Sequence, residues 1–176
     1  MFHGWDNYFT LLGTAAGGLI GLLFVVVTLT SGYDRAKAQR GQSIYMTPTM
    51  LHFAVVLSAS AMTLVPGLTA FRATALMAVA TLVGLVNTVW ACLGIRMLGK
   101  GEDPPHWTDF WLYGAAPALI YVALGGACGL FAVGSDLAPH ALAVLLLALL
   151  LLGIRNAWDL ITWMAPGRNR PPGEAG

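Results

Sequence analysis

Five long apolar stretches alternate with short polar segments along the chain. Each stretch has the roughly 20 residues that an α-helix needs to cross the hydrocarbon core of a bilayer. The pattern predicts an all-α fold, an integral membrane helical bundle in one domain over residues 1–165, followed by a polar, proline-rich and disordered cytoplasmic tail over residues 166–176. The five predicted transmembrane helices cover about residues 9–30, 48–70, 73–98, 110–133 and 137–164.

The composition supports a membrane protein and argues against a soluble one. Hydrophobic residues make up 57% of the chain and charged residues only 10%, whereas a soluble domain carries about 25% charged residues. The lipid bilayer is therefore the expected surrounding medium of the helices. The net charge of +1 gives no field that would attract nucleic acid, so we expect no nucleic-acid partner.

The distribution of lysine and arginine predicts the orientation in the membrane. Cytoplasmic loops carry an excess of these residues, and with five spans one side of the membrane receives seven of them against one on the other. We therefore predict the N-terminus outside and the C-terminus in the cytoplasm. The cytoplasmic set is Arg35, Lys37, Arg40, Arg96, Lys100, Arg168 and Arg170, and the residue on the outer side is Arg72.

Small residues recur at helical spacing in two of the predicted spans. Gly13, Gly17 and Gly21 are four residues apart in the first span, and Gly125 and Gly129 repeat this spacing in the fourth. Rows of small residues allow membrane helices to approach closely. The rows predict helix-packing seams, either within the chain or between copies of it as a homo-oligomer.

Polar residues inside the spans gather toward the predicted cytoplasmic side. Arg155, Asn156 and Asp159 lie near the end of the fifth span, Asn87 lies past the middle of the third, and His52 lies one turn into the second. Charged residues at the bilayer centre cost about 2.5–3.5 kcal/mol on insertion scales. These five residues therefore form a candidate polar pocket that opens to the cytoplasm.

The fifth span leaves two alternatives open. In the first, the helix continues past residue 154 and buries Arg155 and Asp159 as a pair, because side chains four residues apart share one face. In the second, the span ends at residue 154, and Asn156 caps a short helix that lies at the membrane surface.

Two stretches resemble a group of small, uncharacterised, multi-pass proteins of the bacterial inner membrane. They are the glycine-rich run over residues 13–29 and the late run Arg-Asn-Ala-Trp-Asp-Leu over residues 155–160. The resemblance implies a bacterial inner-membrane location and a role for Arg155, Asn156 and Asp159. It implies no activity, substrate or cofactor.

The sequence gives little support to catalysis. It contains no His-Glu-x-x-His, no Gly-x-Ser-x-Gly and no phosphate-binding Gly-x-x-x-x-Gly-Lys-Ser/Thr motif. Its four histidines do not pair at ligand spacing on any predicted helix, so we expect no metal and no cofactor. We therefore expect a protein that is not an enzyme.

Two functions remain, from different classes. The first is a non-catalytic membrane scaffold or regulator that docks a cytoplasmic protein partner. The second is a homo-oligomeric channel or small transporter, in which Arg155 and Asp159 line a cytoplasm-facing vestibule. Five helices are too few to enclose a pathway alone, so the second function requires oligomerisation.

Overall fold

A computed structural model describes residues 2–30, 46–98, 108 and 110–164. This part of the chain is helical and contains no β-strand, which confirms the predicted all-α fold. The predicted tail and the basic residues between the first two helices lie outside the described residues. The elements in chain order are α1 (Asp6–Thr30), α3 (Thr47–Thr63), α4 (Ala70–Leu98), η2 (Phe110–Ala115), α6 (Ala116–Ala132) and α7 (Leu137–Met164).

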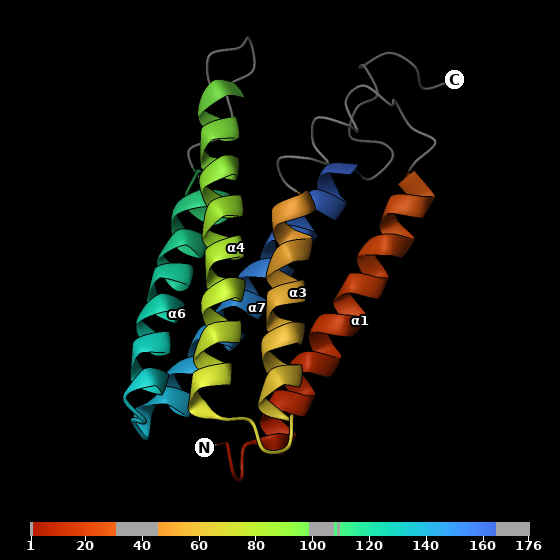
Figure 1. Cartoon of the computed structure of the whole chain (residues 1–176). Coiled ribbons are helices and arrows are strands. Elements are labelled where there is room, and N and C mark those ends of the chain that lie inside the picture. The colour runs from red at the N-terminus through yellow and green to blue at the C-terminus, as the bar shows by residue number, and fades with distance from the viewer. Residues whose placement is uncertain (1, 31–45, 99–107, 109, 165–176) are drawn as a thin grey trace, which may run out of the picture.

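Four of the helices form a ring, and α1 lies outside it. Helix α3 packs against α4 and α7, and α6 packs against the same two helices, so α3 and α6 occupy opposite corners of the ring. Helix α1 packs along α3 and α7 on the outer side of the ring. In Figure 1 it starts beside α3 and leans away from the other helices toward its C-terminal end.

Within the described residues, four helices are long and apolar enough to cross a membrane: Asp6–Leu29, Ala70–Arg96, Phe110–Ala132 and Leu137–Thr162. Helix α3 has 17 residues and is therefore about 26 Å long at 1.5 Å per residue. This is shorter than the roughly 30 Å of a typical hydrocarbon core. The predicted second span, residues 48–70, is thus too long, and the predicted third span begins three residues late because α4 starts at Ala70.

Proline and glycine explain where α3 ends. Pro66 has no N–H to donate to the carbonyl four residues earlier, and its ring would clash with that carbonyl in a continuing helix. The chain instead closes with short bonds from the Leu64 and Val65 amides to the Ala61 and Met62 carbonyls. Gly67 then takes a left-handed φ of 67°, which turns the chain back toward α4.

The turn between α6 and α7 is a complete Schellman motif. The Ser135 amide donates to the Leu130 carbonyl at 2.9 Å, and the Gly134 amide donates to the Phe131 carbonyl at 3.1 Å. Gly134 has the left-handed φ of 69° that this motif places just after a helix. The short turn makes α6 and α7 antiparallel neighbours.

Aromatic side chains fasten the first residues of the chain to the rest of the bundle. The Trp5 ring meets the edge of His140 at a centroid distance of 4.9 Å, and Phe2 lies 5.5 Å from Phe131. The Tyr8 hydroxyl donates to the Ala143 carbonyl of α7 at 3.0 Å. These contacts hold the start of the chain against α6 and α7.

The outer surface of the described helices is apolar. Large hydrophobic side chains are exposed on every helix, among them Leu29, Phe71, Trp90, Leu119 and Val144. Soluble monomers rarely expose continuous apolar surface of this extent. The surface is the one expected of a protein whose helices contact lipid.

Candidate functional site

A hydrogen bond between a histidine and a tyrosine crosses the centre of the helix ring. The Nδ1 atom of His52 on α3 lies 2.9 Å from the hydroxyl of Tyr121 on α6. Both side chains are completely buried. Because α3 and α6 occupy opposite corners of the ring, the two side chains together close the space between them at this level. His52, one of the predicted pocket residues, is thus an interior residue.

Tyr121 reaches His52 because α4 has a glycine at the point where the tyrosine side chain passes it. A Cβ atom at Gly84 would overlap the Tyr121 ring carbons Cε1 and Cζ. The aromatic ring of Tyr121 therefore lies directly against the α4 backbone. One turn further along α4, the buried Thr88 hydroxyl donates to the Gly84 carbonyl at 2.8 Å, so its hydrogen-bonding need is met by its own helix.

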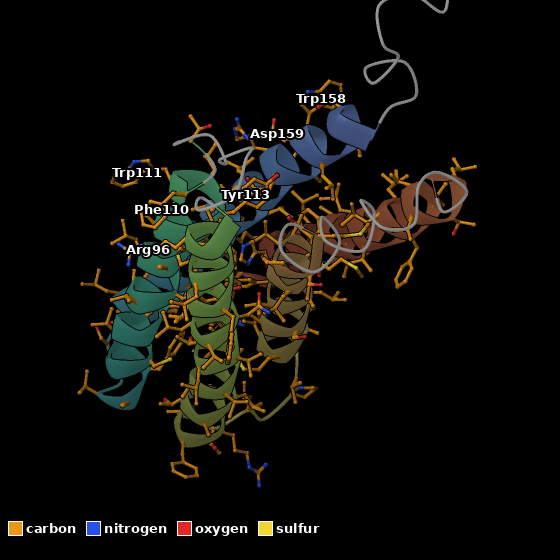
Figure 2. The ribbon with its side chains drawn as sticks, turned by 90° about the horizontal axis from the view of Figure 1, so that it is seen from above. Arg96, Phe110, Trp111, Tyr113, Trp158 and Asp159 are labelled. Atoms are coloured by element: carbon orange, nitrogen blue, oxygen red, sulfur yellow. The ribbon has the colours of Figure 1, made fainter. Side chains whose placement is uncertain are left out.

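Asn156 joins α7 to the π-helical segment η2. Its side-chain Nδ2 atom donates to the backbone carbonyl of Leu112 at 3.1 Å. The Tyr113 hydroxyl donates to the backbone carbonyl of Asn156 at 3.0 Å. Asn156 is completely buried. Figure 2 shows this end of the bundle from above, with Tyr113 between η2 and α7. The segment ends next to Pro117, whose missing N–H interrupts regular α-helical bonding, and π-helical turns occur frequently at functional sites.

Several buried polar atoms have no hydrogen-bond partner among the residues that the structure describes. They include His52 Nε2, Ser60 Oγ, Asn87 Oδ1 and Asn156 Oδ1. A neutral imidazole donates through one ring nitrogen and accepts through the other, so Nε2 remains able to bind a further group. An unsatisfied buried polar atom costs about 1–3 kcal/mol, and internal water is the usual partner of such atoms. Bound water is therefore the expected partner of these atoms.

Arg155 and Asp159 lie apart from these interior residues. They form an ion pair along α7, but their side chains are 47% and 40% exposed. Helix α7 continues through Met164, so the alternative of a separate surface helix after residue 154 is wrong. The expectation that the pair is buried is also wrong, because the pair faces outward from the bundle while Asn156 faces inward.

The structure thus divides the five predicted pocket residues into two groups. His52 and Asn156 are buried, and Asn87 is partly buried with its Oδ1 atom enclosed. Arg155 and Asp159 lie on the outer face of α7. The amide Asn156 lies between the two charged residues in sequence, and a rotation of about 100° from Arg155 brings it to the side of α7 that faces η2.

The predicted glycine seams are only partly in contact with other helices. A Cβ atom at Gly13 would lie 3.2 Å from the Cβ of Ser60 on α3, so this residue allows α1 and α3 to approach. A Cβ atom at Gly17 would barely touch Leu57, and one at Gly21 or Gly129 would meet no described atom within 4 Å. Gly125 makes only an ordinary contact with Thr81.

The glycines with the closest neighbours are others, which the repeat pattern did not indicate. Besides Gly84, they are Gly114, whose Cβ would lie 2.6 Å from the Cys92 sulfur, and Gly153, whose Cβ would lie 2.6 Å from Phe53. Tyr121 was also missed, because an isolated tyrosine in an apolar span gives no sign of its partner. The useful signal would have been single glycines facing bulky residues on neighbouring helices.

Comparison with protein-family models, curated proteins and solved structures gave no match. Within the described part of the chain, no group of three histidine, cysteine, aspartate or glutamate side chains is placed to hold a metal ion.

Proposed function

We propose that the protein is a multi-pass protein of the bacterial inner membrane with five spans, its N-terminus outside and its C-terminus in the cytoplasm. Four helices with the length and hydropathy of spans support a membrane location. The antiparallel order of the helices and the excess of lysine and arginine in alternate connections support the five-span orientation. Helix α3 is short for a span, but its neighbours α1, α4 and α7 surround it.

Within that membrane, we propose a non-catalytic scaffold or regulator that binds a protein partner. The observation that carries this proposal is the His52–Tyr121 contact, which closes the centre of the helix ring. A solute moving along the ring axis would have to break this hydrogen bond and displace the Tyr121 ring from Gly84. The outward-facing surface of α7, with Arg155, Trp158 and Asp159, is instead accessible for docking.

Site-specific photo-crosslinking in cells tests the docking proposal. A photoreactive amino acid at position 158 should give a discrete crosslinked product whose yield falls when Arg155 is replaced by Gln. The same amino acid at Leu119, which is equally exposed on α6, is the matched control and should not give that product. Equal product at both positions, or none at either, would contradict a specific partner at this face.

The homo-oligomeric channel or small transporter remains the second proposal, and one observation favours it. Arg155 and Asp159 face outward from α7 near the end of a membrane helix, where they offer charges that a second copy of the chain could meet with its own. A second copy of the chain could shield the pair and form a pathway between subunits. A strictly monomeric protein in mild detergent, together with vesicles that are no more permeable than protein-free ones, would exclude this function.

A further inference from the structure

The segment η2 lacks one backbone hydrogen-bond donor because a proline follows it. In an α-helix a carbonyl accepts from the amide four residues later, and in a π-helix it accepts from the amide five residues later. Pro117 has no N–H to donate. In the π-helical register, the carbonyl that loses its donor is therefore that of Leu112, whereas in the α-helical register it is that of Tyr113.

Asn156 supplies the donor that the π-helical register requires. Its side-chain Nδ2 atom donates to the Leu112 carbonyl at 3.1 Å, and the residue is completely buried. In the α-helical register the Leu112 carbonyl already has the Ala116 amide as its donor. The Asn156 bond therefore stabilises the π-helical register more than the α-helical one, although the π-helix is the rarer form.

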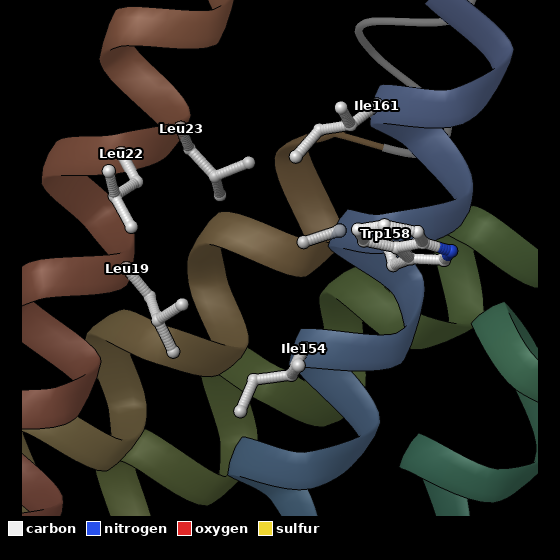
Figure 3. A pocket seen from close by; sticks show the side chains of 7 residues that line it. Leu19, Leu22, Leu23, Ile154, Trp158 and Ile161 are labelled. Carbon is white, nitrogen blue, oxygen red and sulfur yellow. The ribbon is translucent and has the colours of Figure 1, made fainter.

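The packing of α7 fixes the direction of the Asn156 side chain. Ile154 and Trp158, two residues before and after it, line the space between α7 and α1 (Figure 3). Two residues correspond to about 200° around a helix, so Asn156 lies on the opposite flank of α7, toward η2. A Cβ atom at Gly153 would lie 2.6 Å from the Phe53 ring, and this close packing opposes rotation of α7.

The C-terminal part of η2 is held closely by its neighbours. The Tyr113 hydroxyl donates to the Asn156 carbonyl at 3.0 Å, and a Cβ atom at Gly114 would lie 2.6 Å from the Cys92 sulfur on α4. Trp111, by contrast, is 52% exposed. The two registers differ by one residue, which corresponds to about 100° and 1.5 Å along a helix. A change of register would therefore rotate Trp111 and leave the held part in place.

We propose that η2 is a register switch that Asn156 holds in the π-helical form. While the Asn156 side chain donates to the Leu112 carbonyl, η2 is π-helical and Trp111 is exposed. When that bond is absent, the segment converts to an α-helix and Trp111 rotates about the axis of α6. Because Asn156 contacts η2, Trp111 lies at the same end of the bundle as Trp158 (Figure 2). The switch thus alters the surface at the end that carries the proposed docking face, but it does not depend on docking.

Fluorine NMR of the full chain in detergent micelles tests the switch. The protein is labelled with 5-fluorotryptophan, and the Trp111 signal is assigned by its loss in Trp111→Phe. We expect one dominant Trp111 signal in the unmodified protein. Asn156→Leu should raise the population of a second Trp111 signal, relative to the first, by about tenfold. Asn87→Leu is the matched control, because Asn87 is also a partly enclosed amide with an unpartnered Oδ1 atom but lies on α4. It should leave the Trp111 signal unchanged.

Pro117→Ala reaches the α-helical register by a different route. An alanine at this position restores the missing N–H, so neither register leaves a carbonyl without a backbone donor. The commoner α-helical form should then be favoured even though Asn156 is intact. The second Trp111 signal should therefore appear at the same chemical shift as in Asn156→Leu. A merely local disturbance of the segment would not produce a shared second signal from two unrelated substitutions.

Three results would overturn the proposal. The first is a Trp111 signal that stays single in both Asn156→Leu and Pro117→Ala. The second is a pair of new signals at different chemical shifts in the two variants, because the segment would then be disturbed rather than switched. The third is an equal change in Asn87→Leu, which would indicate general loosening of the bundle. If Asn156→Leu does not fold, Pro117→Ala decides, and absence of the second signal in that variant overturns the switch.

The Trp111 signals and the crosslink at position 158 are separate measurements. A protein that shows the second signal in both variants but gives no crosslink would contradict only the scaffold. A protein that gives the crosslink but keeps a single Trp111 signal in both variants would contradict only the register switch.

Discussion

His52 of α3 and Tyr121 of α6 are hydrogen-bonded at 2.9 Å across the centre of the helix ring. They are 69 residues apart in the sequence and lie on helices at opposite corners of the ring. Each helix of the ring contributes to this arrangement: α4 supplies Gly84, against which the tyrosine ring lies, and α7 packs beside α3. The contact therefore reports whether the whole ring is assembled.

Removing the hydroxyl in Tyr121→Phe should lower the free energy of unfolding by about 1 kcal/mol, because His52 loses its partner in a buried site. A cycle that adds His52→Leu should show a coupling of about 0.6 kcal/mol between the two residues. Unfolding of the detergent-solubilised protein by a denaturing detergent measures both values. Strictly additive effects would mean that the two groups do not interact.

The close approach at Gly84 should make Gly84→Ala destabilising by about 1–3 kcal/mol, because a methyl group there overlaps the Tyr121 ring. Gly126→Ala on α6 is the control, since no atom of the described residues lies within 4 Å of its Cβ position. The control should be neutral or stabilising by up to about 1 kcal/mol, because alanine is the better helix former. Thermal unfolding of both variants checks this, and similar shifts in both would contradict the packing.

The contacts of Asn156 should control the order of the π-helical segment. Asn156→Leu removes the bond to the Leu112 carbonyl, so that amide protons of residues 110–115 should exchange faster with solvent deuterium, by about tenfold for a loss of about 1.4 kcal/mol. Thr162→Val on the same helix is the control, because its hydroxyl donates to the Asp159 carbonyl of its own helix. Unchanged exchange in Asn156→Leu would show that the segment is held by other contacts.

The ion pair on α7 should contribute little to folding. Exposed pairs are worth about 0.2–1 kcal/mol, so Arg155→Gln and Asp159→Asn should each change the free energy of unfolding by less than about 1 kcal/mol. The measurement is the same detergent titration, repeated at high salt. A much larger loss in either variant would indicate that the pair is buried against a partner or a second subunit.

The proposed orientation predicts from which side of the membrane a thiol reagent reaches each end of α7. In a background with Cys92→Ala and Cys128→Ala, Asp159→Cys should react with a membrane-impermeant thiol reagent only from the cytoplasmic side. Ser135→Cys, in the turn at the other end of α7, should react only from outside. Labelling of inside-out and right-side-out vesicles distinguishes reaction from the cytoplasmic side from reaction from outside. Leu152→Cys should react if a water-filled vestibule reaches that depth and should not react if α7 simply ends at the membrane surface. Reaction of Asp159→Cys from the outer side would reverse the orientation.

Hydropathy located most helices well, and its errors have local causes. Helix α7 was predicted as residues 137–164 and has those bounds, because a long apolar segment in a bilayer must satisfy its backbone hydrogen bonds internally and only a helix does so. The second span was predicted seven residues too long, since residues 64–70 are mostly apolar although Pro66 and Gly67 end the helix.

The sequence by itself determined the helical class, the approximate spans and the presence of polar groups near the end of the chain. Only the tertiary structure decided which of those groups face inward: Asn156 is buried, and Arg155 and Asp159 are exposed. In a soluble protein, water would mark the outer face of a helix with polar residues, but lipid is as apolar as the interior. The rotation of a membrane helix is therefore set by its neighbours, such as Phe53 against Gly153, and not by its own pattern.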